Sequence, residues 1–113
     1  MSLRRGDIHW IEFPASTARE EMGRRPAIIV QADTAPALPT VFVVPLTSNL
    51  RAARFPGTLE VEPSLGNGLK VPSVILAFQL RAIDRIRVAE RLGSLDPQDL
   101  AALDGHLRSL LSL

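Results

Sequence analysis

The most constraining feature of the sequence is a short apolar run at residues 27–30, which directly follows two arginines, Arg24 and Arg25, and a proline. The run is rich in β-branched residues and has no polar alternation, as is typical of a strand buried on both faces. Pro26 fixes its own φ and favours an extended Arg25, so we expect the Arg25 guanidinium to project from a strand entrance. These residues alone leave open whether the arginines are a solvated edge or a binding site.

Further short runs of β-forming residues are separated by proline, glycine and polar residues. They lie at residues 8–13, 40–44, 58–62, 73–78 and 88–92. We expect Pro45 to end the regular pairing of the third strand, because proline cannot donate a ladder hydrogen bond. Residues 15–24 are interpreted as a surface loop, residues 51–57 as a basic loop and residues 83–86 as a short helical turn. Trp10, in the first run, is predicted to lie in the core.

The C-terminal segment carries the clearest local signals. Asp96 is a suitable N-cap, Pro97 suits the first helical position, and Asp99 favours the positive end of the helix dipole. Leu95 can pack against Leu100 across the start of the helix. One apolar stripe follows at helical spacing, made of Leu100, Leu103, Leu107, Leu110 and Leu111. The stripe is expected to cover the open side of the sheet or a partner subunit.

Together these patterns predict a mostly β protein with α. The expected architecture is a small, strongly curved antiparallel sheet or partial barrel with a C-terminal helix. A length of 113 residues with 46% hydrophobic residues suits one domain spanning residues 1–113.

Composition also limits the classes of function. The absence of cysteine excludes disulfides, a thiol nucleophile and cysteine-ligated zinc. No apolar run approaches the roughly 18 residues of a membrane span, so we expect a cytoplasmic protein without a membrane partner. The net charge of +1 does not by itself indicate a polyanionic partner. All but one of the 13 basic residues are arginine, which suits phosphate contact and base stacking.

The candidate chemistry is concentrated around two strands. Its residues are Arg19, Glu20, Glu21, Arg24 and Arg25 near the second strand, and Thr47, Ser48 and Asn49 at the end of the third. A carboxylate, guanidinium groups and hydroxyls supply what metal-free attack of a ribose 2′-OH on the adjacent phosphate needs: a base, and donors for the developing charge. The alternative is that the glutamates only neutralise nearby arginines on a solvated loop.

Four blocks of the sequence, in this order, resemble the MazF/PemK/Kid family of toxin endoribonucleases. They are Arg5-Gly6-Asp7-Ile8, residues 20–30, residues 44–48 and residues 79–84. The resemblance implies a plasmid-maintenance toxin barrel of five to seven strands, similar to an SH3 fold, in a homodimer. It also implies sequence-specific cleavage of single-stranded RNA such as mRNA, without a metal or other cofactor, and a MazE-like antitoxin that blocks the RNA groove.

The resemblance assigns roles to three positions. Arg25 matches the arginine implicated in acid–base and phosphate roles, and Thr47 matches the threonine that holds the scissile phosphate. Glu20 falls where several members carry a glutamate and is the candidate base. The family's products are a 2′,3′-cyclic phosphate and a 5′-hydroxyl, in agreement with the available side chains.

Seven further residues are predicted to bind RNA: Arg24, Ser48, Asn49, Arg51, Arg54, Phe78 and Arg81. Phe78 departs from the family pattern, because many members have an acid at this position and some use it in catalysis. A mechanism that depends on that acid therefore does not transfer to this chain. Phe78 has two interpretations: it fills the core, which is the favoured one, or it stacks on a base, for which it is counted among the RNA-binding residues.

Two other functions are compatible with the same fold. Some toxins with this fold bind DNA gyrase and have no catalytic activity, although Arg25 with Thr47 favours the ribonuclease branch. An inactive member that only binds antitoxin is the other alternative, and Phe78 in place of the acid supports it. The cut-site sequence is not readable from the chain, because it depends on loop contacts to splayed bases.

Overall fold

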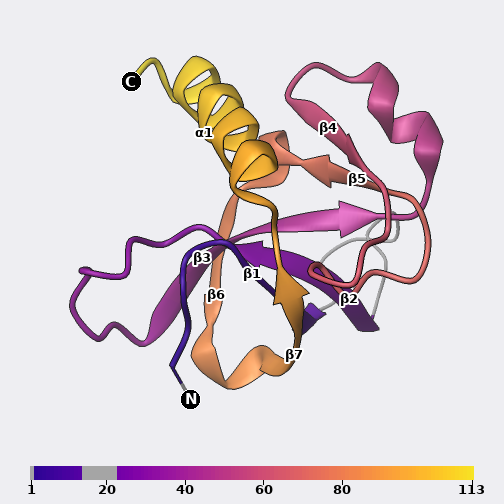
Figure 1. The fold of residues 1–113 in the computed structure, drawn as a ribbon. Coiled ribbons are helices and arrows are strands. Elements are labelled where there is room, and N and C mark those ends of the chain that lie inside the picture. Colours follow the sequence, from indigo (N-terminus) through magenta and orange to yellow (C-terminus); the bar gives the residue numbers. More distant parts are fainter. Residues whose placement is uncertain (1, 14–22) are drawn as a thin grey trace.

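The computed structural model describes residues 2–13 and 23–113 and shows a strongly curved antiparallel sheet with one covering α-helix (Figure 1). The strands are β1 (Asp7–Phe13), β2 (Gly23–Ile29), β3 (Thr40–Thr47), β4 (Thr58–Val61), β5 (Ser73–Leu76), β6 (Arg81–Asp84) and β7 (Val88–Ser94). Helix α1 spans Pro97–Leu111, and three 3-10 helices are η1 (Leu50–Arg54), η2 (Ala77–Gln79) and η3 (Arg85–Arg87). This mostly β architecture of seven strands with a C-terminal helix confirms the predicted fold class.

The sheet runs in the order β4-β5-β3-β2-β1-β7, with β6 paired to β3 beside this path. The long strand β3 therefore changes partner along its length. Its first half pairs with β6 as far as Val43, and its second half pairs with β5 from Leu46 onward. Pro45 lies between the segment of β3 that pairs with β6 and the segment that pairs with β5. Its missing N–H is therefore not needed for either pairing. The prediction that Pro45 ends the regular pairing is only partly right: the pairing with β2 ends at Pro45, opposite Ala27, but β3 continues to Thr47 in pairing with β5.

Both faces of the central strands are buried, as predicted for residues 27–29, whereas Val30 lies beyond the end of β2 and is only partly buried. One core cluster contains Ile28 and Val44, and a second contains Ala27 and Val43. Alternate residues of β2 and β3 therefore point into different cores, because successive strand residues face opposite sides. The strand itself is longer than predicted at its start: Arg24 and Arg25 lie within β2 instead of before it.

Helix α1 covers the first core, and its start agrees with the sequence signals. The Asp96 side chain accepts a hydrogen bond from the Gln98 backbone N–H at 2.7 Å. Leu95 and Leu103 are buried in the core, with Leu100 packed against it. The later part of the leucine stripe is different, because Leu110 and Leu111 remain about half exposed. No helix among the described residues is both long and apolar enough to cross a membrane.

The strands at the two ends of the sheet order, β4 and β7, are brought together by the loop that follows β4. The Ser94 N–H of β7 donates to the Gly66 carbonyl, in the connection between β4 and β5, at 2.9 Å. Gly93 makes the approach possible, since a Cβ there would lie 2.3 Å from the Gly66 oxygen. Gly68 has a φ of +71°, and a Cβ there would lie 2.1 Å from the Leu92 oxygen. The sheet therefore curves into a partial barrel fastened by loop contacts.

Several local predictions are wrong. Residues 83–86 were expected to form a helical turn, but Arg81–Asp84 form β6, and the 3-10 helix starts at Arg85. Pairing with β3, and burial of Ile83 in the second core, outweigh the local propensity. The basic loop contains the 3-10 helix η1, for which Asn49 is the N-cap. Trp10 is only partly buried.

Candidate functional site

Arg25 and Thr47 meet where β2 and β3 lie at the open end of the second core. The pairing of β2 with β3 ends at Ala27 and Pro45, two residues from Arg25 and from Thr47, and both of these side chains line the same two cavities. The Arg25 Nη2 donates to the Leu46 carbonyl oxygen at 3.4 Å, and the Thr47 Oγ1 accepts from the Asn49 N–H at 3.2 Å. A guanidinium and a hydroxyl are thus positioned side by side by two paired strands.

Two cavities share this pair as a common wall. The first, here named the aromatic cavity, has a volume of about 220 Å³. It is lined by Phe13, Arg25, Pro45, Thr47, Asn49, Ala52, Phe55, Leu76, Phe78, Gln79 and Arg81. The second, the Trp10 cavity, has a volume of about 340 Å³. It is lined by Trp10, Arg24, Arg25, Pro26, Leu46, Thr47, Ser48, Gly68, Leu69, Lys70, Val71, Ser73 and Leu92.

Positive charge in the aromatic cavity is held against an aromatic ring. The Arg81 guanidinium lies 5.2 Å from the Phe13 ring centroid, and that of Arg25 lies 6.0 Å from it. Cation–π contact favours this placement of both guanidinium groups. Two guanidinium groups therefore converge beside Thr47, as binding of a phosphate oxygen requires.

Arg24 has different surroundings from Arg25. Its Nη2 lies 2.5 Å from the Glu90 Oε1, and its guanidinium lies 5.6 Å from the Trp10 ring centroid. Backbone hydrogen bonding at Glu90, and then the hydrogen bond from Arg24, hold the pKa of Glu90 below its ordinary value. Arg24 thus closes one side of the Trp10 cavity while part of its charge is neutralised.

The remaining predicted residues surround the wall to different degrees. Ser48 lines the Trp10 cavity, and Asn49 lines the aromatic cavity while accepting from the Arg51 N–H at 3.2 Å. Arg51 is exposed and lines neither cavity. The Arg54 guanidinium stacks 4.8 Å from the Phe55 ring centroid. Glu20, the predicted base, lies outside the described residues.

Phe78 does not fill the core as predicted. Strand β5 ends at Leu76, and the following 3-10 helix η2 turns Phe78 outward, where it is 41% exposed. Its ring meets that of Phe55 at a centroid distance of 5.7 Å and an interplanar angle of 63°. The sequence-based assignment missed Phe55, Phe13 and Gln79. The one available signal was Phe55 directly after Arg54 in the basic loop.

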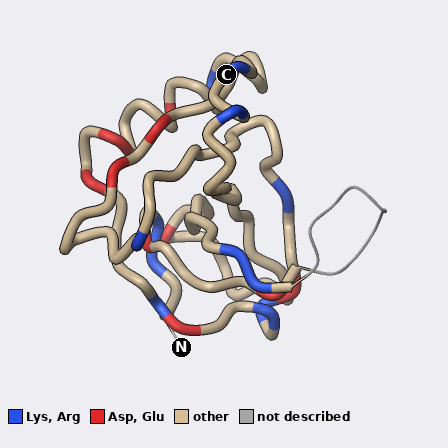
Figure 2. The backbone as a smooth tube through the Cα atoms, turned by 90° about the vertical axis from the view of Figure 1, so that its right-hand side faces the viewer, with Lys and Arg blue, Asp and Glu red and all other residues tan. Residues whose placement is uncertain are grey.

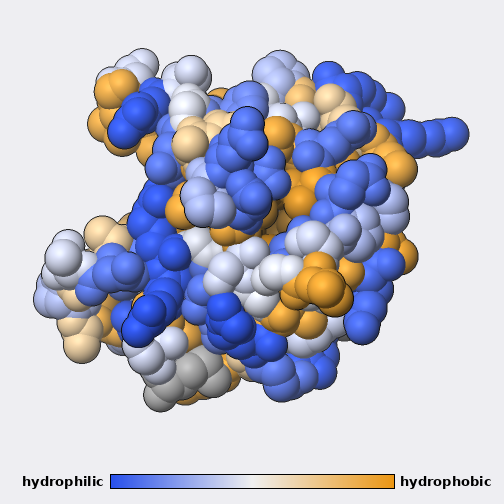
Figure 3. All heavy atoms as spheres, viewed as in Figure 1, coloured by the Kyte–Doolittle hydropathy of each residue, from blue (hydrophilic) through white to orange (hydrophobic). Residues whose placement is uncertain are grey.

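The charge distribution shows no dominant basic face. Figure 2 shows Lys and Arg positions on several segments around the backbone, with acidic positions among them. Figure 3 likewise shows hydrophobic groups reaching the surface between hydrophilic ones. Within residues 2–13 and 23–113, no group of three or more His, Asp or Glu residues could hold a metal ion. Local convergence at the Arg25–Thr47 wall, not overall charge, distinguishes the site.

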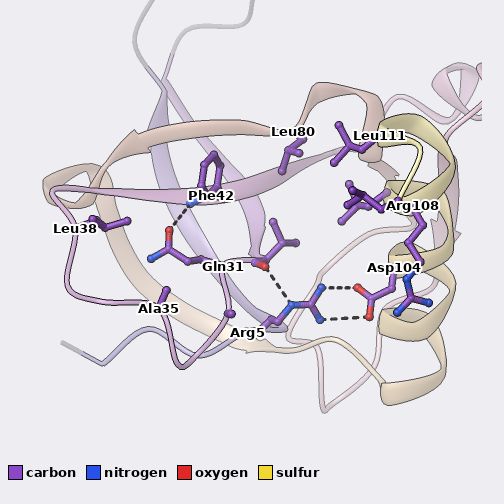
Figure 4. A pocket seen from close by; sticks show the side chains of 13 residues that line it. Arg5, Gln31, Ala35, Leu38, Phe42, Leu80, Asp104, Arg108 and Leu111 are labelled. Atoms are coloured by element: carbon purple, nitrogen blue, oxygen red, sulfur yellow. Dashed lines mark hydrogen bonds and ion pairs between the residues drawn. The ribbon is translucent and has the colours of Figure 1, made fainter.

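A third hollow, named the helix groove, has a volume of about 720 Å³ and a different chemistry. Figure 4 shows α1 on one side and the segment carrying Ala35 and Leu38 on the other. Its polar groups are largely engaged with each other: the Arg5 Nη2 pairs with the Asp104 Oδ1 at 2.5 Å, and the Arg5 Nε donates to the Val30 carbonyl at 3.1 Å. Phe42, Leu107 and Leu111 contribute apolar lining. This groove suits apolar packing more than catalysis.

The fold and the wall together define a class of protein: a small antiparallel β-barrel that presents an arginine–threonine pair at one end of its sheet. The model of the PemK-like, MazF-like toxins of type II toxin–antitoxin systems matches residues 4–111, and the chain belongs to this family.

Individual relatives agree with this assignment over nearly the whole chain. Endoribonuclease EndoA of Bacillus subtilis (strain 168) is 29% identical over 114 residues, covering 100% of this chain and 97% of that protein. MazF from Deinococcus radiodurans is 30% identical with a TM-score of 0.77, covering 100% and 99% of the two chains. In a MazE–MazF crystal structure from the same organism, the matching chain is 30% identical with a TM-score of 0.79, covering 100% and 98%.

Proposed function

We propose that the protein is a sequence-specific endoribonuclease toxin that cleaves single-stranded RNA, such as mRNA, in the cytoplasm without a metal ion. The observation that supports this proposal is that Arg25 and Thr47 together line two neighbouring cavities, with the Arg25 guanidinium donating to the Leu46 carbonyl beside Thr47. A phosphate on this wall has room for chain on both sides. Family membership and the similarity to an endoribonuclease support the same activity.

The reaction is an internal phosphoryl transfer. The 2′-oxygen attacks the adjacent phosphorus while the bond from phosphorus to the 5′-oxygen breaks, which leaves a 2′,3′-cyclic phosphate and a 5′-hydroxyl. A base must take the 2′-proton and an acid must supply a proton to the leaving oxygen. Negative charge grows on the non-bridging oxygens, and fixed donors stabilise it.

Three residues fill these roles, and Arg25, which the family resemblance implicates in acid–base as well as phosphate roles, is the candidate donor of the proton to the leaving 5′-oxygen. The Arg25 guanidinium donates to the charged phosphate oxygens, and the Thr47 hydroxyl holds the phosphate in position. Glu20 is the candidate base, and Glu20→Gln tests it: a normal cleavage rate would move that role to another group. The guanidinium of Arg81, which lines the same cavity and lies 5.2 Å from the Phe13 ring centroid, adds a second positive charge.

The direct test is incubation of the purified protein with a long unstructured RNA in EDTA. We expect discrete cuts whose upstream ends carry cyclic phosphate. Arg25→Ala should remove this activity, whereas Arg4→Ala, which removes an exposed arginine that lines neither cavity, should not. Intact RNA together with blocked DNA gyrase supercoiling would instead support a gyrase-binding toxin, and intact RNA with antitoxin binding alone would support an inactive member.

We also propose that the protein forms a homodimer and binds a MazE-like antitoxin that covers the RNA site. The helix groove is the face best suited to a second copy, because it combines a hollow with protruding apolar side chains. Leu111 and Phe42 line the groove, yet they are 52% and 46% exposed. A two-fold arrangement would let the leucines of each copy enter the groove of the other.

A further inference from the structure

The exposed aromatic pair is the feature of the site that phosphate binding does not explain. Phe55 and Phe78 are 44% and 41% exposed, although both are large apolar side chains. They contact each other edge to face and line the cavity that contains Arg25 and Thr47. Phosphate chemistry needs donors and cations, so two phenylalanines at this place indicate a different part of the ligand.

The pair is held in place by the backbone around it. The Ala77 N–H, at the start of η2, donates to the Gly57 carbonyl at 2.9 Å. On the other side, the Thr58 hydroxyl donates to the Phe55 carbonyl at 2.8 Å. These bonds fasten η2 to the segment that carries Phe55. A surface fixed before binding loses little conformational entropy when a ligand arrives.

The polar groups beside the Phe55–Phe78 pair can form hydrogen bonds with the edge of a base and can balance the negative charge of a nucleotide. Gln79 and Asn49 line the same cavity, and a side-chain amide offers both donors and an acceptor to a base edge. The side-chain oxygen of Asn49, Oδ1, already accepts a hydrogen bond from the Arg51 N–H. Gln79 is therefore better placed than Asn49 to form hydrogen bonds with the edge of a base. Arg54 stacks on the Phe55 ring and adds positive charge near the cavity mouth.

We propose that the aromatic cavity binds one unpaired base of the RNA, belonging to a nucleotide directly joined to the scissile phosphate. Phe55 and Phe78 form the apolar wall that the base packs against, and the Gln79 amide reads the base edge. The position follows from the shared wall, since Arg25 and Thr47 line the cavity and also bind the phosphate. This inference rests on the proposed endoribonuclease function and specifies how its substrate is chosen.

The test uses the full-length protein, a randomised single-stranded RNA pool in EDTA, and sequencing of the cleaved ends. We expect Phe78→Ala and Phe55→Ala to raise KM by about fivefold to a hundredfold, because stacking contributes that much per base. The value of kcat should change much less, and the melting temperature should stay near that of the wild type. Gln79→Ala should relax the base preference at one position next to the cut.

Leu65→Ala is the matched control, because Leu65 is fully exposed and lines neither cavity. It should keep the wild-type KM and base preference. The wild type could cut RNA while the variants at Phe55, Phe78 and Gln79 keep the wild-type KM and base preference. That result would refute the proposed base site and leave the endoribonuclease function unaffected.

A wild type that cuts no RNA would defeat the proposed function separately. Binding of a short single-stranded RNA, measured by fluorescence anisotropy, then decides the base site. Weaker binding by Phe78→Ala than by Leu65→Ala supports it, and equal binding overturns it.

Discussion

The Arg25–Thr47 wall and the helix groove are both hollows at the surface of one small barrel, yet their side chains differ in kind. The wall brings two guanidinium groups and a hydroxyl to one place, with aromatic rings beside them. The groove is larger, but the contacts of its Arg5 are to Asp104 and to a backbone carbonyl. Size therefore does not identify the chemical site; convergent donors that face a cavity do.

The comparison predicts that variants at the two places fail in different ways. A change at the wall should affect cleavage while the assembly stays intact. A change in the groove should affect assembly first.

The largest effect is expected from Arg25→Ala. Loss of a positioned donor to developing charge costs about 3–4 kcal/mol, a loss of roughly a hundredfold to a thousandfold in rate. Single-turnover cleavage of an unstructured RNA measures it, with size-exclusion chromatography and thermal melting as controls. Cleavage by this variant at the wild-type rate would show that Arg25 has no role in the mechanism. It would also contradict the proposal that the Arg25–Thr47 wall binds the scissile phosphate.

The next largest effect is expected in the groove, from Phe42→Asp. A charge at the centre of an apolar interface should cost about 2 kcal/mol or more, which raises the dimer Kd by about thirtyfold. Analytical ultracentrifugation over a concentration series measures this change. Ile86→Asp is the control, because Ile86 is also an exposed apolar residue but lies outside the groove. An unchanged Kd for Phe42→Asp would place the dimer contact on another face.

A smaller effect is expected from Thr47→Ala. The hydroxyl supplies one neutral hydrogen bond, so we expect about 1 kcal/mol and a roughly fivefold slower cleavage. The Asn49 N–H also loses its acceptor in this variant, so a thermal melt should accompany the kinetics. A loss as large as that of Arg25→Ala would mean that Thr47 does more than position the phosphate.

The smallest effect is expected from Glu90→Gln, which removes the exposed partner of Arg24. The pKa of Glu90 is lowered in the folded state, so its contribution to stability is present at neutral pH and is lost as the pH falls below the ordinary value of 4.5. The melting temperatures of wild type and variant should therefore differ slightly at pH 7 and converge in acid. A difference that grows in acid would contradict this sign.

Much of the fold could be predicted because its signals are local. The Asp96 cap and the following proline mark the helix start by contacts within one turn. The β-branched run at Ala27 to Ile29 identifies a buried strand in the same way. Strand β6 was missed because its four residues carry weak local preference and depend on pairing with β3.

The candidate site was only partly predictable for a related reason. Arg25 and Thr47 were found through motifs that resemble a family, and the register then brought them together. Phe55 gave no comparable signal, since its role depends on meeting Phe78 across a cavity. The core assignment of Phe78 failed because the turn of η2 directs the side chain outward, and an apolar residue type alone cannot report that direction.

By itself, the sequence determined the helix start, most of the strands and the inventory of groups that can handle phosphate. Those properties follow from interactions between residues a few positions apart. Only the tertiary structure decided that Arg25 and Thr47 line the same two cavities, and that two exposed phenylalanines meet in one of them. The reason is that strand register and core packing, which join distant parts of the chain, fix where each side chain finally points.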